Sequence, residues 1–325
     1  MVTTKDITLA HTFAKINDAS SSPSSRTPVL LVFINGLMLP RKQWSATLNQ
    51  LSTLLASRTK PIYTLTYDRY GQGESRSPDN PDWKPTPHDL SAAATELDAL
   101  LADTLATHAT ELGPHPTLIF VSHSIGVPLA RIHNQQTTNS KHLAAAHLFL
   151  DSNIANTDFI SIFPDPDSPD FDPSIQLPEG TTPDDLRGLR QRTRAMFHPS
   201  IPNPEGLDRS NLAELLPNAD KPTLRGPEVS TGKETSPYLT VVGHDPVAFA
   251  QEGLRMQGTH VGFNEMYMQP VWDAYNEGLM ELVAHKERVK GVIIAEGAGH
   301  FVQRDTPEVV ARQVVDLIQR VEGGK

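Results

Sequence analysis

A serine in a short motif that ends in glycine is the residue of this chain best placed to do chemistry. Residues 122–126 read Ser-His-Ser-Ile-Gly and directly follow an apolar run of strand length. The run predicts a buried strand and the residues after the motif predict a helix, so Ser124 lies at the apex of a sharp turn. Such a turn projects a hydroxyl beyond the sheet and admits only small neighbours, here Ser122 and Gly126. The pattern indicates a nucleophilic serine, with an ordinary turn as the alternative.

Further polar side chains follow predicted strands in the same way. Apolar runs of strand length occur at 28–34, 61–67, 117–121, 146–150, 237–242 and 291–295, and helical patterns such as 89–112 and 306–321 separate or follow them. This alternation predicts an α/β fold with a mostly parallel sheet and helices on both faces. Asn35, Asp68, Ser124 and Asp151 each come just after a strand. Because the carboxyl ends of parallel strands lie at one edge of a sheet, we expect these side chains to gather there.

The regular alternation of strand and helix patterns stops between residues 153 and 236. Prolines interrupt this stretch repeatedly, and only residues 184–197 have a firm helical pattern. Structureless connections of this length are unusual in compact domains, so we expect an inserted cap or lid over the strand ends. The predicted organisation is therefore a core of residues 1–152 and 237–325 with a cap of residues 153–236.

Composition excludes several classes of function. The 28 Lys and Arg against 38 Asp and Glu give a formal charge of −10, which argues against nucleic acid or an anionic membrane surface as a partner. The absence of cysteine excludes disulfides and thiolate chemistry, and no histidine spacing typical of a metal site occurs. No phosphate-binding or dinucleotide-binding glycine motif is present either, so we expect no metal and no cofactor. With no transmembrane run and no signal-like N-terminus, a soluble cytoplasmic protein is expected. The oligomeric state is not determined by the sequence.

Four separated signatures, taken together, resemble the α/β-hydrolase superfamily over about residues 28–321. They are Asn35-Gly36 after the first long strand, the run Asp68-Arg69-Tyr70-Gly71-Gln72-Gly73-Glu74-Ser75, the turn at Ser124, and Gly299-His300 before the terminal helix. The resemblance implies a mostly parallel eight-stranded sheet with a cap inserted after the sixth strand. The implied chemistry is hydrolysis by a serine.

A serine hydroxyl is a weak nucleophile unless a base removes its proton. His300 is the best candidate for this base, because it lies on a glycine-flanked loop after a strand end. A carboxylate must then orient the imidazole, and two aspartates compete for this role. Asp245 occupies the position that most of the superfamily uses, and Asp151 the position that some members use instead. We favour Asp245 and keep Asp151 as the alternative acid.

The resemblance also implies an oxyanion hole and a substrate pocket. The backbone amides of Leu37 and Ile125 are expected to stabilise the oxyanion, the second of them at a helix N-terminus. Apolar residues of the cap and its surroundings are expected to line the pocket, or alternatively to pack the cap onto the sheet; the candidates are Met38, Phe159, Phe163, Met196, Phe197 and Met266.

These features predict a serine hydrolase, an esterase or lactonase that cleaves a small apolar ester or lactone through an acyl-enzyme on Ser124. A serine at the nucleophile position argues against the epoxide hydrolase and haloalkane dehalogenase branches, which use a carboxylate. Two alternatives remain open. One is a receptor-like protein that binds a small apolar ligand, and the other is a biosynthetic enzyme that uses the same three side chains to cleave a carbon–carbon bond or to cyclise an acyl chain.

Overall fold

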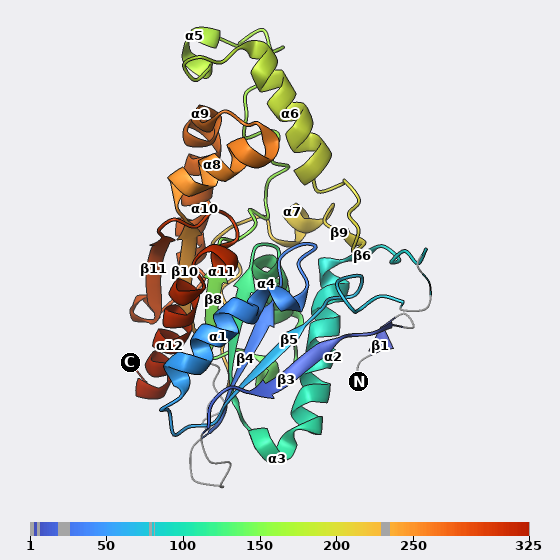
Figure 1. Cartoon of the computed structure of the whole chain (residues 1–325), viewed down its shortest axis with the longest axis vertical. Helices are drawn as coiled ribbons and strands as arrows, with labels where there is room; N and C mark the ends of the chain where they lie inside the picture. The colour runs from blue at the N-terminus through green and yellow to red at the C-terminus, as the bar shows by residue number, and fades with distance from the viewer. Residues whose placement is uncertain are drawn as a thin grey trace.

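A seven-stranded sheet forms the centre of the molecule (Figure 1). The computed structural model of the chain describes residues 3–4, 7–18, 27–77, 80, 82–228 and 235–324. The strands lie in the order β11-β10-β8-β7-β4-β5-β3, and all pairs are parallel except β3 with β5. Their bounds are β3 His11–Lys15, β4 Val29–Ile34, β5 Ile62–Tyr67, β7 Thr117–His123, β8 Ala146–Leu150, β10 Tyr238–His244 and β11 Val289–Ala295.

The α/β class and the mostly parallel sheet agree with the prediction, but the sheet has seven strands and not eight. Its edge on the N-terminal side is β3, the antiparallel strand. The two short strands that precede it, β1 (Thr3–Thr4) and β2 (Ile7–Thr8), pair only with each other. Because these two strands form a separate sheet, they add no eighth strand to the central sheet.

Helices cover both faces of the sheet. In β4, Val29, Leu31 and Phe33 pack into one core with α1 (Ser45–Leu55) and α12 (Pro307–Gly323), while the alternate residues pack into the other core. The second core includes α2 (Leu90–Thr107), α4 (Gly126–Gln136) and α10 (Gln269–Met280). Every residue of β4, β5, β8 and β10 is buried, as expected for strands of a sheet covered on both sides.

The segment between β8 and β10 stands above the carboxyl edge of the sheet (Figure 1). It contains α5 (Pro173–Gln176), α6 (Pro183–Phe197), β9 (Leu207–Asp208) and α7 (Leu212–Leu215), and its residues 229–234 lie outside the described part of the chain. β9 pairs with β6 (His88–Asp89), which ties the segment to the core. α8 (Pro246–Gln257), α9 (Val261–Phe263) and the π-helix Asn264–Met268 rise beside it from the connection after β10.

The remaining helices are short. They are α3 Ala109–Leu112, α11 Val302–Asp305 and the 3₁₀ turns Arg41–Trp44, Ser140–His142 and Lys286–Arg288. None of the helices in the described ranges combines the length and the apolar character needed to span a bilayer.

One core residue makes stability depend on pH. His147 of β8 is fully buried between Phe120 and Phe149, and neither ring nitrogen has a hydrogen-bond partner among the described residues. Burial, with a smaller effect of the nearby His133, lowers the pKa of His147 from 6.5 to about 3. The unfolded chain therefore binds a proton at this residue below pH 6.5 while the folded chain does not, so stability is lost as the pH falls through this window.

We expect His147→Phe to flatten this pH dependence, because the substitution removes the group that protonates only in the unfolded state. Between pH 6.5 and 3 the slope of the unfolding free energy should fall by up to about 1.4 kcal/mol per pH unit. Urea titrations at a series of pH values measure this slope. His115→Phe, at an exposed loop histidine, is the matched control and should leave the slope unchanged. An unchanged slope in His147→Phe would contradict this assignment.

Candidate active site

Ser124 lies where β7 turns sharply into α4. Its backbone is left-handed, with φ of +53°, and the turn carries its side chain to the carboxyl edge of the sheet. A Cβ on Gly126 would lie 2.5 Å from the carbonyl oxygen of Ile34, so only glycine fits at that position. Ser122 is still part of β7 and pairs with Ile34, so this position needs no left-handed backbone. This explains why serine can stand where the usual motif has glycine.

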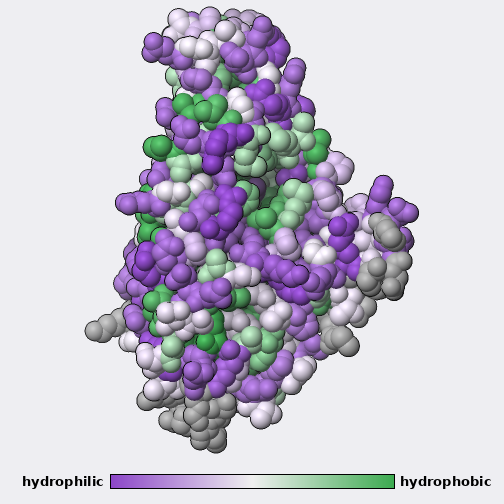
Figure 2. All heavy atoms as spheres, in the orientation of Figure 1, coloured by the Kyte–Doolittle hydropathy of each residue, from purple (hydrophilic) through white to green (hydrophobic). Residues whose placement is uncertain are grey.

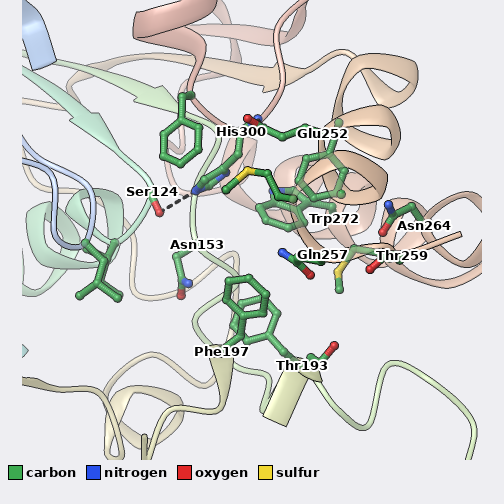
Figure 3. Close-up of a pocket in the computed structure, with 18 of the residues that line it drawn as sticks. Ser124, Asn153, Thr193, Phe197, Glu252, Gln257, Thr259, Asn264, Trp272 and His300 are labelled. Carbon is green, nitrogen blue, oxygen red and sulfur yellow. Dashed lines mark hydrogen bonds between the residues drawn. The ribbon is translucent and has the colours of Figure 1, made fainter. Parts of the chain in front are cut away.

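The imidazole of His300 contacts Ser124 on one side, as Figure 3 shows, and Asp151 on the other. The Ser124 hydroxyl and His300 Nε2 are 3.0 Å apart, which places the serine proton in position to be donated to that nitrogen. On the other side of the ring, Nδ1 donates to Asp151 Oδ2 over 2.6 Å. The three side chains thus form one line of hydrogen bonds in the order that a serine nucleophile, its base and an orienting acid require.

Asp151 follows β8 and is completely buried. Burial opposes its charged form, but the hydrogen bonds and charges of His244 and His300 outweigh this and hold the pKa of Asp151 below its usual range. His244, the last residue of β10, donates from Nδ1 to the second oxygen, Asp151 Oδ1, over 2.7 Å. Each carboxylate oxygen therefore faces one imidazole.

Asp245, the acid favoured from the sequence, does not contact His300. Its carboxylate caps the N-terminus of α8 and accepts hydrogen bonds from the amides of Val247 and Ala248, at 2.9 and 3.3 Å. Its other oxygen accepts from the amide of Gly297 at 2.9 Å. The first amides of a helix need acceptors, and Asp245 supplies one. The preference for Asp245 is therefore corrected by the geometry, which places the alternative, Asp151, against His300.

Backbone strain is concentrated around these residues. Among the described residues, the non-glycine positions with positive φ are Met38 (57°), Ser124 (53°), Asp151 (39°) and Phe159 (65°). Two of them carry the hydrogen-bonded side chains, and the other two line the adjoining pocket. Such conformations persist only where the surrounding structure imposes them, and they cluster at functional sites.

The loop after β4 and the start of α4 bring two backbone amides close to the serine. Leu37 and Ile125, the residues expected to form the oxyanion hole, both line the pocket next to Ser124. Within the described residues, neither of their amides has a hydrogen-bond partner. Ile125 directly precedes α4, where the helix dipole favours negative charge. The two amides are thus free to bind an oxygen of a ligand.

A buried ion pair fixes the conformation of the Leu37 loop. Glu205, from the segment between β8 and β10, accepts from the amide of Met38 at 2.9 Å and pairs with Arg69 at 3.0 Å. The same guanidinium donates to the carbonyls of Asn35 and Gly36. The side chain of Asn35 in turn donates to the carbonyl of Tyr67 and accepts from the indole of Trp44. The segment between β8 and β10, called the inserted segment from here on, therefore holds the loop that presents the Leu37 amide.

A pocket opens between the serine and the inserted segment, visible as a hollow with green apolar residues at its rim (Figure 2). Four of the six predicted lining residues do line it: Met38, Phe159, Phe163 and Phe197. Met196 and Met266 do not, and both are 43% exposed. On α6, consecutive residues point about 100° apart, so Phe197 faces the pocket while Met196 faces solvent.

Sequence reasoning missed several residues of the site. They are the second imidazole His244, the polar pocket residues Asn153, Thr193 and Asn264, and Glu252 of α8. Glu252 accepts from the amide of His300 at 3.0 Å and from Arg304 at 2.8 Å, so it anchors the histidine loop. His244 was visible in the sequence beside Asp245, but no local signal separates a strand-end histidine of this kind from a solvated one.

His123, which precedes the serine, also supports the histidine loop. Its Nε2 donates to the carbonyl of His300 at 2.8 Å, and its Nδ1 lies 3.3 Å from Gln303 Nε2 and accepts from it. Burial, together with the charge of His300, lowers the pKa of His123 to about 3. A neutral His123 braces the backbone of His300 and takes no part in removing the serine proton.

Comparisons with known proteins identify the family. The model of the Alpha/beta hydrolase family matches residues 31–313, so the chain belongs to that family. A search of curated proteins finds no match.

Solved structures of the same fold are distant in sequence. A peroxisomal alpha-beta-hydrolase from Saccharomyces cerevisiae is 12% identical, with 98% of this chain and 90% of that chain covered and a TM-score of 0.53. An esterase from Exiguobacterium antarcticum is 13% identical, with 96% and 95% covered and a TM-score of 0.48. A bromoperoxidase from Bacillus anthracis is 12% identical, with 96% of each chain covered and a TM-score of 0.48. At such identities the likeness to the yeast protein shows the fold alone.

We expect Glu205→Ala to destabilise the protein strongly. Glu205 is 2% and the Arg69 side chain 1% exposed, so the substitution leaves a buried guanidinium without its counter-charge. The free energy of unfolding should fall by about 3 kcal/mol or more, measured by urea titration. Glu214→Ala, at an exposed glutamate of α7 in the same segment, is the control and should change stability by less than about 0.5 kcal/mol. Equal effects of the two substitutions would contradict the structural role of the pair.

Proposed function

We propose that the protein is a serine hydrolase that cleaves a neutral, largely apolar carboxylic ester or lactone. The observation that carries the proposal is the continuous line of hydrogen bonds from Ser124 through His300 to the buried Asp151, at the wall of an apolar pocket. Membership of a hydrolase family supports an enzyme.

In the proposed mechanism, His300 Nε2 takes the proton of the Ser124 hydroxyl while the oxygen attacks the carbonyl carbon of the substrate. The negative charge moves to the carbonyl oxygen, where the amides of Leu37 and Ile125 stabilise it. Collapse of the tetrahedral intermediate breaks the ester bond, and His300 returns the proton to the leaving alcohol. Water then attacks the acyl-enzyme with His300 again as the base. Asp151 keeps Nδ1 protonated throughout, so Nε2 faces the serine.

The pocket supports a substrate without net charge. Its lining includes seven aromatic or sulfur-containing side chains from the inserted segment and from the connection between β10 and β11: Phe159, Phe163, Phe197, Phe249, Met256, Met268 and Trp272. The charged side chains among the described lining residues, besides His300, are Arg209 and Glu252, and both have partners in the protein. Arg209 donates to three backbone carbonyls at and just after the end of α6, and Glu252 pairs with Arg304. Glu252 is thus ion-paired and Arg209 is held by backbone carbonyls, and the apolar lining supports burial of apolar surface as the main source of affinity.

A panel of p-nitrophenyl esters of increasing chain length, together with lactones, tests the proposal directly. We expect kcat/KM to rise with chain length until the pocket is filled, because each buried methylene adds about 0.8 kcal/mol. Ser124→Ala should abolish turnover. Ligand binding without turnover by the folded protein would contradict the proposal and favour a receptor-like role.

The choice of acid gives a sharper prediction. We expect Asp151→Asn to lower kcat by about 10⁴-fold, because an amide no longer selects the tautomer of His300 with a proton on Nδ1. Asp245→Asn serves as the matched control, since it changes an aspartate after the neighbouring strand that only caps α8; its kcat should stay within about tenfold. Circular dichroism verifies that both variants are folded. A larger loss of kcat in Asp245→Asn than in Asp151→Asn would contradict the assignment of Asp151.

A further inference from the structure

The hydrogen-bond line at the active site does not end at Asp151. His244 donates from Nδ1 to Asp151 Oδ1 at 2.7 Å, and its Nε2 lies 2.9 Å from Gln269 Oε1. The amide nitrogen of Gln269 donates to Asp273 Oδ1 at 2.9 Å. These contacts extend the line from the nucleophile to an exposed carboxylate on α10. His244 is 2% exposed and lies outside the pocket lining, so it does not meet the substrate.

The partners of His244 determine its protonation. Both ring nitrogens face oxygens, and a neutral imidazole carries only one N–H, so it would leave one nitrogen lone pair against an acceptor. Turning the Gln269 amide would place its oxygen against the Asp273 carboxylate, which is unfavourable. An imidazolium with a proton on each nitrogen satisfies both contacts.

The packing around His244 favours the same charged form. Its ring stacks on Phe249 at 4.1 Å between centroids, and Trp272 packs against it at 5.2 Å, an arrangement in which aromatic rings stabilise a cation. Burial opposes the charge of His244, but Asp151 and Gln269 outweigh it and raise its pKa above 6.5.

We propose that His244 is a permanently protonated positioning residue that compensates the charge of Asp151 and thereby extends the activity of the Ser124–His300 pair to lower pH. The proposal rests on the proposed function. In a site with a lone aspartate, the full negative charge favours a proton on the catalytic imidazole. Here the carboxylate already pairs with the imidazolium of His244, so Asp151 stabilises a proton on His300 less strongly. His300 therefore stays available as a base at lower pH.

The other charged groups near the two imidazoles come from four elements. Asp273 of α10 faces His244 through Gln269, and Glu252 of α8 binds the backbone of His300. Arg304 of α11 pairs with Glu252, and the neutral His123 of β7 lies 5.0 Å from the His300 ring. Asp245 precedes α8 and points to its first amides. None of these groups forms a side-chain hydrogen bond with both imidazoles, as Asp151 does.

The first test measures protonation and needs no turnover. In Ser124→Ala protein labelled with ¹⁵N-histidine, long-range ¹H–¹⁵N spectra report whether each ring nitrogen carries a proton. The His244 signals are assigned by their loss in His244→Asn. We expect both nitrogens of His244 to be protonated near pH 7. A single protonated nitrogen at that pH overturns the proposal, whatever the enzyme does.

The second test is the pH profile of kcat/KM for a p-nitrophenyl ester. His244→Asn keeps a donor toward Asp151 and removes the cation, so the acid limb should move to higher pH by about one pH unit. KM should change less than about twofold, because His244 does not line the pocket. His285→Gln, at an exposed histidine, is the control and should leave the profile in place. An acid limb that stays in place in folded His244→Asn overturns the proposal. Absence of turnover in the unmodified protein instead overturns the proposed function, and the first test then decides the role of His244 alone.

Discussion

The carboxylate of Asp151 is the group on which the rest of the site depends. A completely buried carboxylate is costly unless charged or polar partners compensate it, and the fold supplies two imidazoles, one to each oxygen. His300 on one side and His244 on the other meet this requirement. The order that Asp151 imposes on His300 reaches Ser124 through a single further hydrogen bond. The strained backbone at Asp151 and Ser124 is maintained because these contacts hold both residues from several sides.

A second constraint links the inserted segment to the chemistry. Glu205 is separated from Met38 by 167 residues, yet its carboxylate holds the amide of Met38 and the guanidinium that braces the same loop. The segment that lines the pocket therefore also shapes the loop proposed to bind the oxyanion. A substrate that moves this segment would change the position of the Leu37 amide. In the proposed mechanism, one buried ion pair would therefore connect the pocket with the loop that binds the oxyanion.

The sequence predicted the parts of this arrangement that depend on local pattern. Apolar runs indicated the parallel strands, and small residues around Ser124 indicated the sharp turn, which the structure contains. The choice between Asp245 and Asp151 depends on which carboxylate points at His300, and strand-end position alone does not determine that. In the structure Asp245 instead caps α8, with Pro246 in the first turn of the helix. Glu205 and His244 act through contacts between distant segments, which no local pattern encodes.

Covalent labelling tests the central claim, that Ser124 is activated by His300 and Asp151, most directly. The folded protein is incubated with a fluorophosphonate probe, digested, and the labelled peptide is located by mass spectrometry. The account predicts label on Ser124 alone and a large loss of labelling in His300→Ala. Folded protein that takes no label, or label on a different residue, would contradict it.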